Sequence, residues 1–274
     1  MNFRYFRRLL VAVAALAAFT ALVPAGAAAT STPAAGYEQF TGCPHPGQNP
    51  LIETCFRSVI SGGELQMGNV EVPITSPITL SGGMTASGTF DFNSNGGLQQ
   101  AKQTVPGGVI GFTGFTWLAE VLPPASLVLR AVIELAGTPG DQLAQPASLP
   151  VKVHFLNQIL GNKCYVGSNV TPLKLQLITG TTSPPPPNSP ISGSEGSVAV
   201  TSPSGITDIT KGINVDNSFA SPGASGCVLT LFGYLPISID IPINTQSALP
   251  SPAGSNTTIQ KFNAEHVAAV AVYP

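Results

Sequence analysis

Few side chains in this sequence are of the types that perform catalysis, and their spacing matches no catalytic motif. The histidines are His45, His154 and His266. His266 directly follows Glu265, so in an extended strand the two side chains point to opposite faces, whereas the H-E-x-x-H motif of zinc proteases aligns two histidines on one helix face. We interpret His45 as a loop residue, and His154 and His266 as strand residues that either lie on the polar face or are hydrogen-bonded.

Neither a hydrolase nucleophile nor a phosphate loop is present as a complete motif. The nearest match to the G-x-S-x-G motif is residues 223–227, which read G-A-S-G-C and lack the final glycine; we interpret Ser225 as part of a turn. Residues 108–114 carry a glycine at every third position but no G-K-[ST], which a P-loop needs. We predict that these glycines are kinks in a strand.

A pair of carboxylates stays open as a source of hydrolytic chemistry. A glycosidase needs two acids roughly 5–10 Å apart across a cleft. The available candidates are Glu53, Glu64, Glu71, Asp91, Glu120, Asp208, Asp216 and Asp240. Their spacing selects no pair, so we assign no catalytic and no binding residue, and we favour a protein without an active site.

The cysteines are the residues for which the sequence predicts a specific chemistry. Four cysteines in an exported chain indicate two disulfides. Of the three possible connectivities we favour Cys43–Cys55, which closes a short loop, together with Cys164–Cys227. Zinc sites usually contain closely spaced C-x2-C or H-x3-H pairs, and the sequence has none; we therefore predict no metal site and no cofactor.

Two alternating segments flank the cysteine at position 164. Residues 151–155 read V-K-V-H-F and residues 173–177 read L-K-L-Q-L, which places their apolar side chains on one face of a strand. Prolines 184–187 cannot donate hydrogen bonds to a sheet. We interpret this proline run as a rigid surface connection, with docking into an aromatic groove of a partner as the alternative.

Short apolar runs separated by glycine and proline fill most of the chain. They cover residues 51–60, 64–72, 74–80, 88–92, 99–105, 109–116, 196–201, 214–219, 227–232, 236–243 and 259–272. Intervals of about ten residues indicate a sandwich or barrel. We predict a mainly β fold of antiparallel sandwich or barrel-like sheets, with at most one or two short helices and two disulfides. It forms one domain over 37–274, or alternatively two β halves, 37–149 and 150–274.

Residues 123–137 depart from the strand pattern. Ser126, Arg130 and Glu134 are spaced by four, which gives an apolar helix one polar stripe, and Gly137 suits the helix end. A strand fits the same residues, because a spacing of four is also even, but we favour the helix. In residues 236–243 isoleucines alternate with polar residues and Pro242, which predicts an edge strand or a bulge.

The N-terminus has the pattern of a secretory signal peptide. Arg4, Arg7 and Arg8 precede an apolar run over 9–23, and residues 24–29 are small enough for cleavage. A membrane anchor, the alternative, needs about 20 apolar residues. We predict a signal peptide over 1–29, a flexible tail over 30–36 and no transmembrane anchor in the mature chain. The expected location is secreted or in the cell envelope, with any envelope contact non-covalent.

Charge limits the partners that this chain can bind. Charged residues make up 9% of it, against roughly 25% in an average globular protein. After removal of the signal peptide, eight basic residues face 13 acidic ones, a net charge of about −5; this excludes nucleic acid as the expected partner. We expect a secreted structural or binding protein. The alternatives are an extracellular carboxylate-dependent hydrolase and an envelope ligand carrier or pore, the latter favoured by an apolar cavity.

The cysteine and proline segments also resemble a known group of proteins. The segments are G-N-K-C-Y-V-G-S at 161–168 and the proline-rich block at 179–191, together with G-C-P at 42–44 and residues 72–83. They are similar to a group of exported β-rich proteins of actinobacteria, over most of the mature chain. The resemblance implies export and a β fold, and it assigns no site residue.

Overall fold

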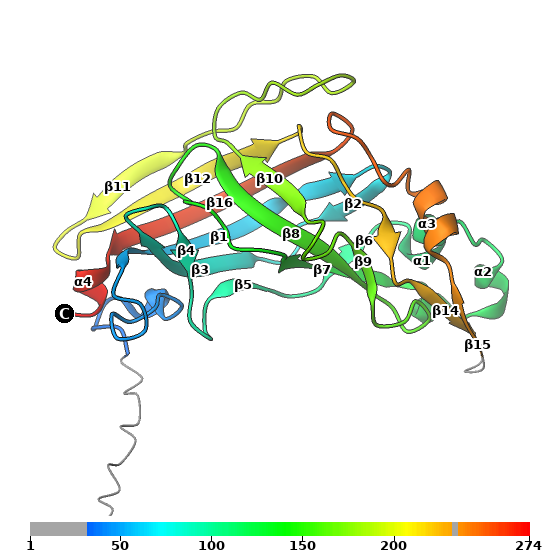
Figure 1. Ribbon diagram of the computed structural model, residues 1–274, viewed down its shortest axis with the longest axis horizontal. Helices are drawn as coiled ribbons and strands as arrows, with labels where there is room; N and C mark the ends of the chain where they lie inside the picture. The colour runs from blue at the N-terminus through cyan, green and yellow to red at the C-terminus, as the bar shows by residue number, and fades with distance from the viewer. Residues whose placement is uncertain (1–31, 232–234) are drawn as a thin grey trace, which may run out of the picture. The chain divides into compact units, whose positions relative to one another are not determined.

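Two antiparallel sheets face each other across a shared apolar core (Figure 1). The computed structural model describes residues 32–231 and 235–274, and residues 32–274 form one compact unit. The expected signal peptide, 1–29, lies outside the described residues, as do the first two residues of the expected tail. Within that tail, the Ala34 amide donates a hydrogen bond to the Val272 carbonyl at 2.8 Å, which ties this segment to the end of the chain.

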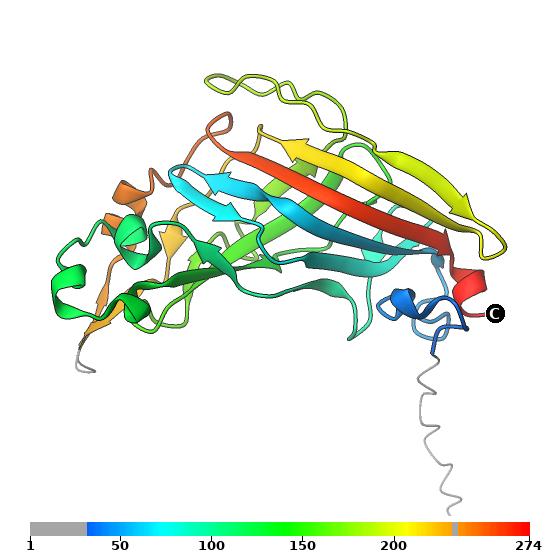
Figure 2. The ribbon, with the colours of Figure 1, turned by 180° about the vertical axis from the view of Figure 1, so that it is seen from behind.

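The larger sheet has eight strands among the described residues. Their order is β11-β12-β16-β1-β3-β4, with β2 beside β1 and β5 beside β3; Figure 2 shows β16 running between β12 and β1. The strands are β1 (Ile52–Met67), β2 (Val70–Pro73), β3 (Ile78–Thr85), β4 (Phe90–Asp91), β5 (Gly97–Gln100), β11 (Ser197–Thr201), β12 (Ile206–Asp216) and β16 (Thr257–Ala268).

The smaller sheet crosses in front of the larger one in Figure 1. Its order is β13-β9-β8-β7-β6, and β10 also pairs with β8. The strands are β6 (Gln103–Val105), β7 (Leu129–Leu135), β8 (Ala147–Leu156), β9 (Cys164–Val166), β10 (Leu173–Leu177) and β13 (Ala224–Ser225). A separate hairpin consists of β14 (Val228–Leu231) and β15 (Leu235–Ser238).

Helices are short throughout the described ranges. They are α1 (Gly108–Thr113), α2 (Leu118–Val121), α3 (Asp240–Gln246) and α4 (Ala269–Val272), with 3-10 turns at Glu38–Phe40 and Pro124–Leu127. The prediction of a mainly β fold with antiparallel, sandwich-like sheets is confirmed. The described chain has four short α-helices, however, where we expected at most one or two.

The α-helix expected over residues 123–137 was wrong, because residues Leu129–Leu135 form strand β7 after a 3-10 turn. After the 3-10 turn, β7 pairs with β6 on one side and β8 on the other. Leu129, Ala131 and Ile133 are buried, while Arg130 is exposed and Glu134 partly exposed. Because a spacing of four is even, Arg130 and Glu134 share one face of a strand as readily as one face of a helix. The segment forms a strand rather than a helix because it pairs with a neighbouring strand on each side.

Two other segments expected to be strands contain helices. Residues 109–116 overlap α1, so the predicted strand kinks were wrong. Gly108 and Gly111 lie within this helix, and Gly114, with a φ of 75°, ends it in the left-handed region. The run 236–243 divides, since β15 ends at Ser238 and α3 begins at Asp240. Pro242 lies in the first turn of α3, where backbone N–H groups have no partner within the helix.

The core confirms the alternation seen in the sequence. In β8 the buried positions are Ala147, Leu149, Val151, Val153 and Phe155, and in β10 they are Leu173, Leu175 and Leu177. The residues between them are exposed or partly exposed. These two strands therefore present a continuous apolar face to the larger sheet.

Both expected disulfides form. Cys43–Cys55 joins the N-terminal loop to β1, and Cys164–Cys227 joins β9 to the residue before β14. Among the described residues there is no free cysteine. The chemistry predicted for the four cysteines is confirmed in both its type and its connectivity.

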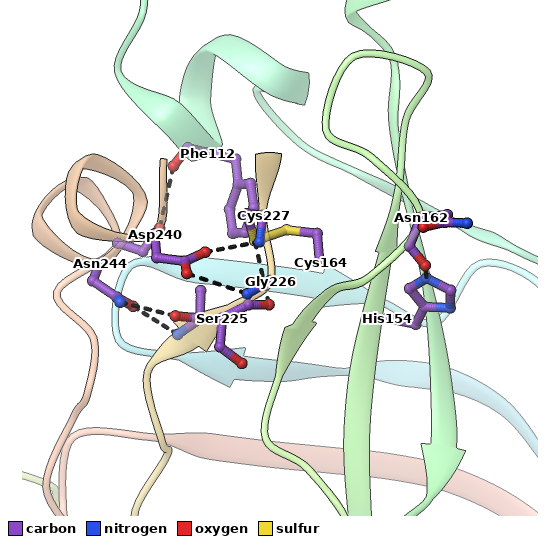
Figure 3. Close-up of a disulfide and its surroundings, with 11 residues drawn as sticks. Phe112, His154, Asn162, Cys164, Ser225, Gly226, Cys227, Asp240 and Asn244 are labelled. Atoms are coloured by element: carbon purple, nitrogen blue, oxygen red, sulfur yellow. Dashed lines mark hydrogen bonds between the residues drawn. A yellow bond between two sulfur atoms is a disulfide. The ribbon is translucent and has the colours of Figure 1, made fainter. Parts of the chain in front are cut away.

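The backbone at the second disulfide is held by α3, as Figure 3 shows. The carboxylate of Asp240, the first residue of that helix, accepts hydrogen bonds from the amides of Gly226 at 3.2 Å and Cys227 at 2.7 Å. Asn244, one turn later, bonds to both the amide and the carbonyl of Ala224. These bonds fix the segment that carries Cys227 against the helix.

Asparagine side chains hold the proline run against the fold. Asn188, directly after the run, donates from Nδ2 to the carbonyls of Asn217 at 2.9 Å and Asn256 at 2.8 Å. Asn217 in turn donates from its side chain to the Ser189 carbonyl at 2.8 Å. These contacts fit the interpretation of residues 184–187 as a rigid surface connection.

Candidate functional site

A cavity of about 230 Å³ lies between the two sheets. It is larger than the roughly 150 Å³ of a cavity that binds benzene, and somewhat smaller than the about 300 Å³ at which sites for drug-sized molecules begin. Its apolar lining consists of Phe56, Ile60, Leu80, Leu143, Ala147, Leu149, Leu177, Val198, Ile209, Phe262 and Ala264. Its polar lining consists of Ser58, Gln142, Gln145, Thr179, Glu195, Asn214 and Gln260.

The floor of the cavity is the inner face of β16 and its neighbours. Along β16, Gln260, Phe262 and Ala264 are buried, whereas Lys261 and Asn263 between them are exposed. This is the alternation of a strand with one face in the core. The strand therefore supplies two apolar side chains and one primary amide to the same surface.

Cross-strand pairing extends the floor across five strands. Ala264 lies opposite Ser58 on one side and Ile209 on the other, and these lie opposite Leu80 and Val198 respectively. Directly opposed residues of antiparallel strands share a face, so the five side chains form one row. At the sheet edge, Val198 is 63% exposed, and the floor thus continues into solvent along β11.

A β-bulge turns Asn214 toward the cavity. The pairing of β12 with β16 shifts by one residue between Ile209 and Gly212. Lys211, in the bulge, has a φ of 59°, and its amide donates to the Asn263 side chain at 2.8 Å. Since strand faces alternate, the additional residue moves Asn214 from the outer to the inner face. It then lies directly opposite Gln260.

The roof combines the smaller sheet with the loop 136–146. Leu149 of β8 faces the cavity from that sheet. In the loop, Gln142 donates from Nε2 to the Ser148 carbonyl at 3.1 Å, and Gln145 accepts the Thr179 amide at 3.0 Å through Oε1. These bonds fix the loop at the rim.

The lining carries a single charge. Glu195, which is exposed just before β11, is the only ionisable residue among the described side chains that border the cavity. A carboxylate transferred into an apolar site is strongly disfavoured unless a positive group pairs with it. The electrostatics therefore favour an uncharged occupant.

The acids considered for hydrolysis lie elsewhere. None of the eight candidates borders the cavity. Buried Asp216 accepts the Gln176 amide at 2.7 Å and both the amide and the hydroxyl of Ser218, so its carboxylate fixes local backbone. Asp91 and Asp240 also accept backbone amides. The cavity thus brings together no pair of these carboxylates.

The histidines do not border the cavity, and two of them, His45 and His154, have side-chain partners within the described fold. His154 Nδ1 lies 3.1 Å from Glu134 Oε1, and its ring stacks on Tyr165 with 4.1 Å between centroids. His45 packs edge-on against Tyr273. His154 and His266 lie on β8 and β16, the strands where the sequence placed them.

His266 lies on the inner face of β16 opposite Phe56. Partial burial lowers the pKa of its imidazole from the ordinary value of 6.5, because desolvation disfavours the charged ring. Just below pH 6.5 the unfolded chain then binds more protons than the folded one, so stability falls as the pH drops through this window.

We expect the His266 ring to titrate below 6.5 in an NMR pH series. We also expect His266→Gln to make the unfolding free energy less dependent on pH in that window, because the variant lacks the titrating ring. A ring midpoint above 6.5 would show that burial does not control this histidine.

The fold and this site define a class: a two-sheet antiparallel β protein with a mainly apolar cavity between its sheets. No family model, no curated protein and no solved structure matches the chain. Among the described residues, no helix is long and apolar enough to cross a membrane.

No residue of the cavity lining was predicted from the sequence. One signal was present: in T-T-I-Q-K-F-N-A, residues 257–264, glutamine shares the alternation phase of Phe262 and Ala264. A polar residue at a core position of a strand is unusual. The position of Gln260 on the buried face of its strand could therefore have identified it as a candidate binding residue.

Proposed function

We propose that this protein is a non-catalytic binding protein that holds a small apolar ligand between its two sheets, outside the cytoplasm. The cavity carries the proposal. Its apolar side chains are the majority of the lining and come from both sheets, its floor reaches the sheet edge, and its polar residues are uncharged apart from Glu195. Sites for small molecules typically combine these properties. Of the functions considered from the sequence, this one corresponds to a ligand carrier.

Burial of apolar surface supplies the affinity. Each methylene group moved from water into such a site contributes about 0.8 kcal/mol. The signal-peptide pattern and the two disulfides support a location outside the cytoplasm. There the ligand is a molecule that is poorly soluble in water and gains from a protein carrier.

Fluorescence titration with N-phenyl-1-naphthylamine, an uncharged apolar dye, tests this function. We expect saturable binding to the wild-type protein. The variant Ala264→Phe places a phenyl ring on the floor of the cavity, so we expect dye affinity to fall at least about tenfold.

The matched control is Ala199→Phe, the same substitution at an exposed position of β11 that lies between Val198 and Val200 and faces outward. It should bind the dye as the wild type does. Equal dye affinity in both variants, with both folded by circular dichroism, would refute ligand binding between the sheets.

A further inference from the structure

Gln260 is a buried polar side chain with no hydrogen-bond partner among the described residues. It is 6% exposed, and it borders both the cavity and a smaller space of about 10 Å³ behind it. On the same strand face Thr258 is 1% exposed, and its hydroxyl donates to the Glu64 carbonyl at 3.0 Å. The atoms sealed from solvent without a partner are Gln100 Oε1, Asn217 Oδ1 and Glu265 Oε2 among the described side chains, so the Gln260 amide is instead accessible from the cavity that it borders. Its donors and acceptor can therefore meet a ligand there.

Two further uncharged polar groups lie on the same floor. Asn214 is opposite Gln260 on β12, and the nine-tenths buried Ser58 lies on β1. The structure gives neither side chain a hydrogen bond to another described residue. A primary amide offers both donors and an acceptor. The pair Gln260–Asn214 therefore matches a group that both donates and accepts.

The charges around the cavity limit which polar group of a ligand can bind to Gln260 and Asn214. Among the described residues that border the cavity there is no lysine, arginine or histidine, and the single charge, Glu195, is negative. A carboxylate or phosphate would lose its hydration there without gaining a counter-charge. An uncharged polar group avoids this cost.

The floor of the cavity also determines the direction in which the apolar part of a ligand would lie. From Gln260 to Ala264 the strand advances four residues, about 13 Å, past Phe262 and onward to the row that ends at exposed Val198. A chain with its polar end at Gln260 would lie along these side chains toward the sheet edge.

We infer that the ligand is a neutral amphiphile, whose hydroxyl or carboxamide group is bound by Gln260 and Asn214 and whose hydrocarbon part lies along Phe262 and Ala264. This inference rests on the proposed function and names the ligand class of the same site. It makes Gln260 the residue that determines specificity for the polar end.

Competition against N-phenyl-1-naphthylamine at pH 8 tests the inference with three ligands of equal chain length: octan-1-ol, octanamide and octanoate. We expect the alcohol and the amide to bind at least about tenfold more tightly than the carboxylate. Gln260→Leu should weaken alcohol and amide binding about tenfold more than it changes dye binding, because the dye lacks the hydroxyl or carboxamide that Gln260 binds. Its melting temperature should equal or exceed that of the wild type, because leucine replaces an amide that makes no hydrogen bond to another described residue.

Gln66→Leu on β1 is the matched control, since Gln66 is exposed; it should bind all three ligands as the wild type does. If the dye binds and Ala264→Phe weakens it, but Gln260→Leu retains full affinity for octan-1-ol, the inference fails while ligand binding stands. A lower melting temperature together with lost dye binding in Gln260→Leu would assign Gln260 to the core and overturn the inference. Absence of dye binding in the wild type would remove the proposed function itself.

Discussion

Replacing Cys164 and Cys227 together by alanine is expected to lower the free energy of unfolding by about 4 kcal/mol. The two cysteines are separated by 63 positions in the sequence. A crosslink restricts the unfolded chain, and the restriction grows with the logarithm of the loop length. Alanine also avoids placing a hydroxyl at Cys227, which is fully buried.

The pair Cys43 and Cys55 provides the matched comparison, because its separation is only 12 positions. The same relation gives a loss of about 3 kcal/mol for that double variant. Urea unfolding followed by far-ultraviolet circular dichroism measures both values. If removing the short-loop crosslink costs more than removing the long-loop one, restriction of the unfolded chain is not the main contribution.

Asn256→Ala is expected to destabilise the protein by about 3 kcal/mol. The side chain is completely buried and makes four hydrogen bonds. Its Oδ1 accepts from the Gly68 amide and the Ser251 hydroxyl, and its Nδ2 donates to the carbonyls of Phe219 and Pro252. Alanine leaves all four partners without this amide in a region closed to solvent, and such groups cost more than a lost exposed bond.

Asn69→Ala is the control for that substitution. Asn69 is exposed, and its side chain donates a single bond to the Gln246 carbonyl at 3.2 Å. Its removal should change the unfolding free energy by less than about 1 kcal/mol. The urea concentrations at the unfolding midpoints of the two variants measure this difference. Equal midpoints would mean that the hydrogen bonds of Asn256 add little to stability.

The strands with strict alternation were predictable because burial alone determines their pattern. Residues 151–155 and 173–177 pair in the same sheet, and the disulfide next to them forms as expected. Residues 123–137 were not predictable in this way, since Arg130 and Glu134 suit either element. Strand pairing on both sides of β7 resolves the ambiguity, and such pairing depends on contacts distant in sequence.

The cavity could not be predicted for a similar reason. Asn214 faces inward only because the bulge at Lys211 changes the phase of β12, and a one-residue shift has no clear signature in a single sequence. The roof depends on the loop 136–146, which is held by bonds from Gln142 and Gln145. Among the residues that line the cavity, only Gln260 could have been suspected from the sequence, because it is a polar residue at a buried position of its strand.

Each sulfur crosslink stays within one layer of the fold. Cys43 and Cys55 meet at β1, while Cys164 and Cys227 meet beside β9 and β13 in the smaller sheet. None of the four cysteines, all of which are described, bridges the gap where the cavity lies. Hydrogen bonds such as those between the backbones of Ile178 and Val215 join the two layers instead, so exchanging the occupant of that gap breaks only non-covalent contacts.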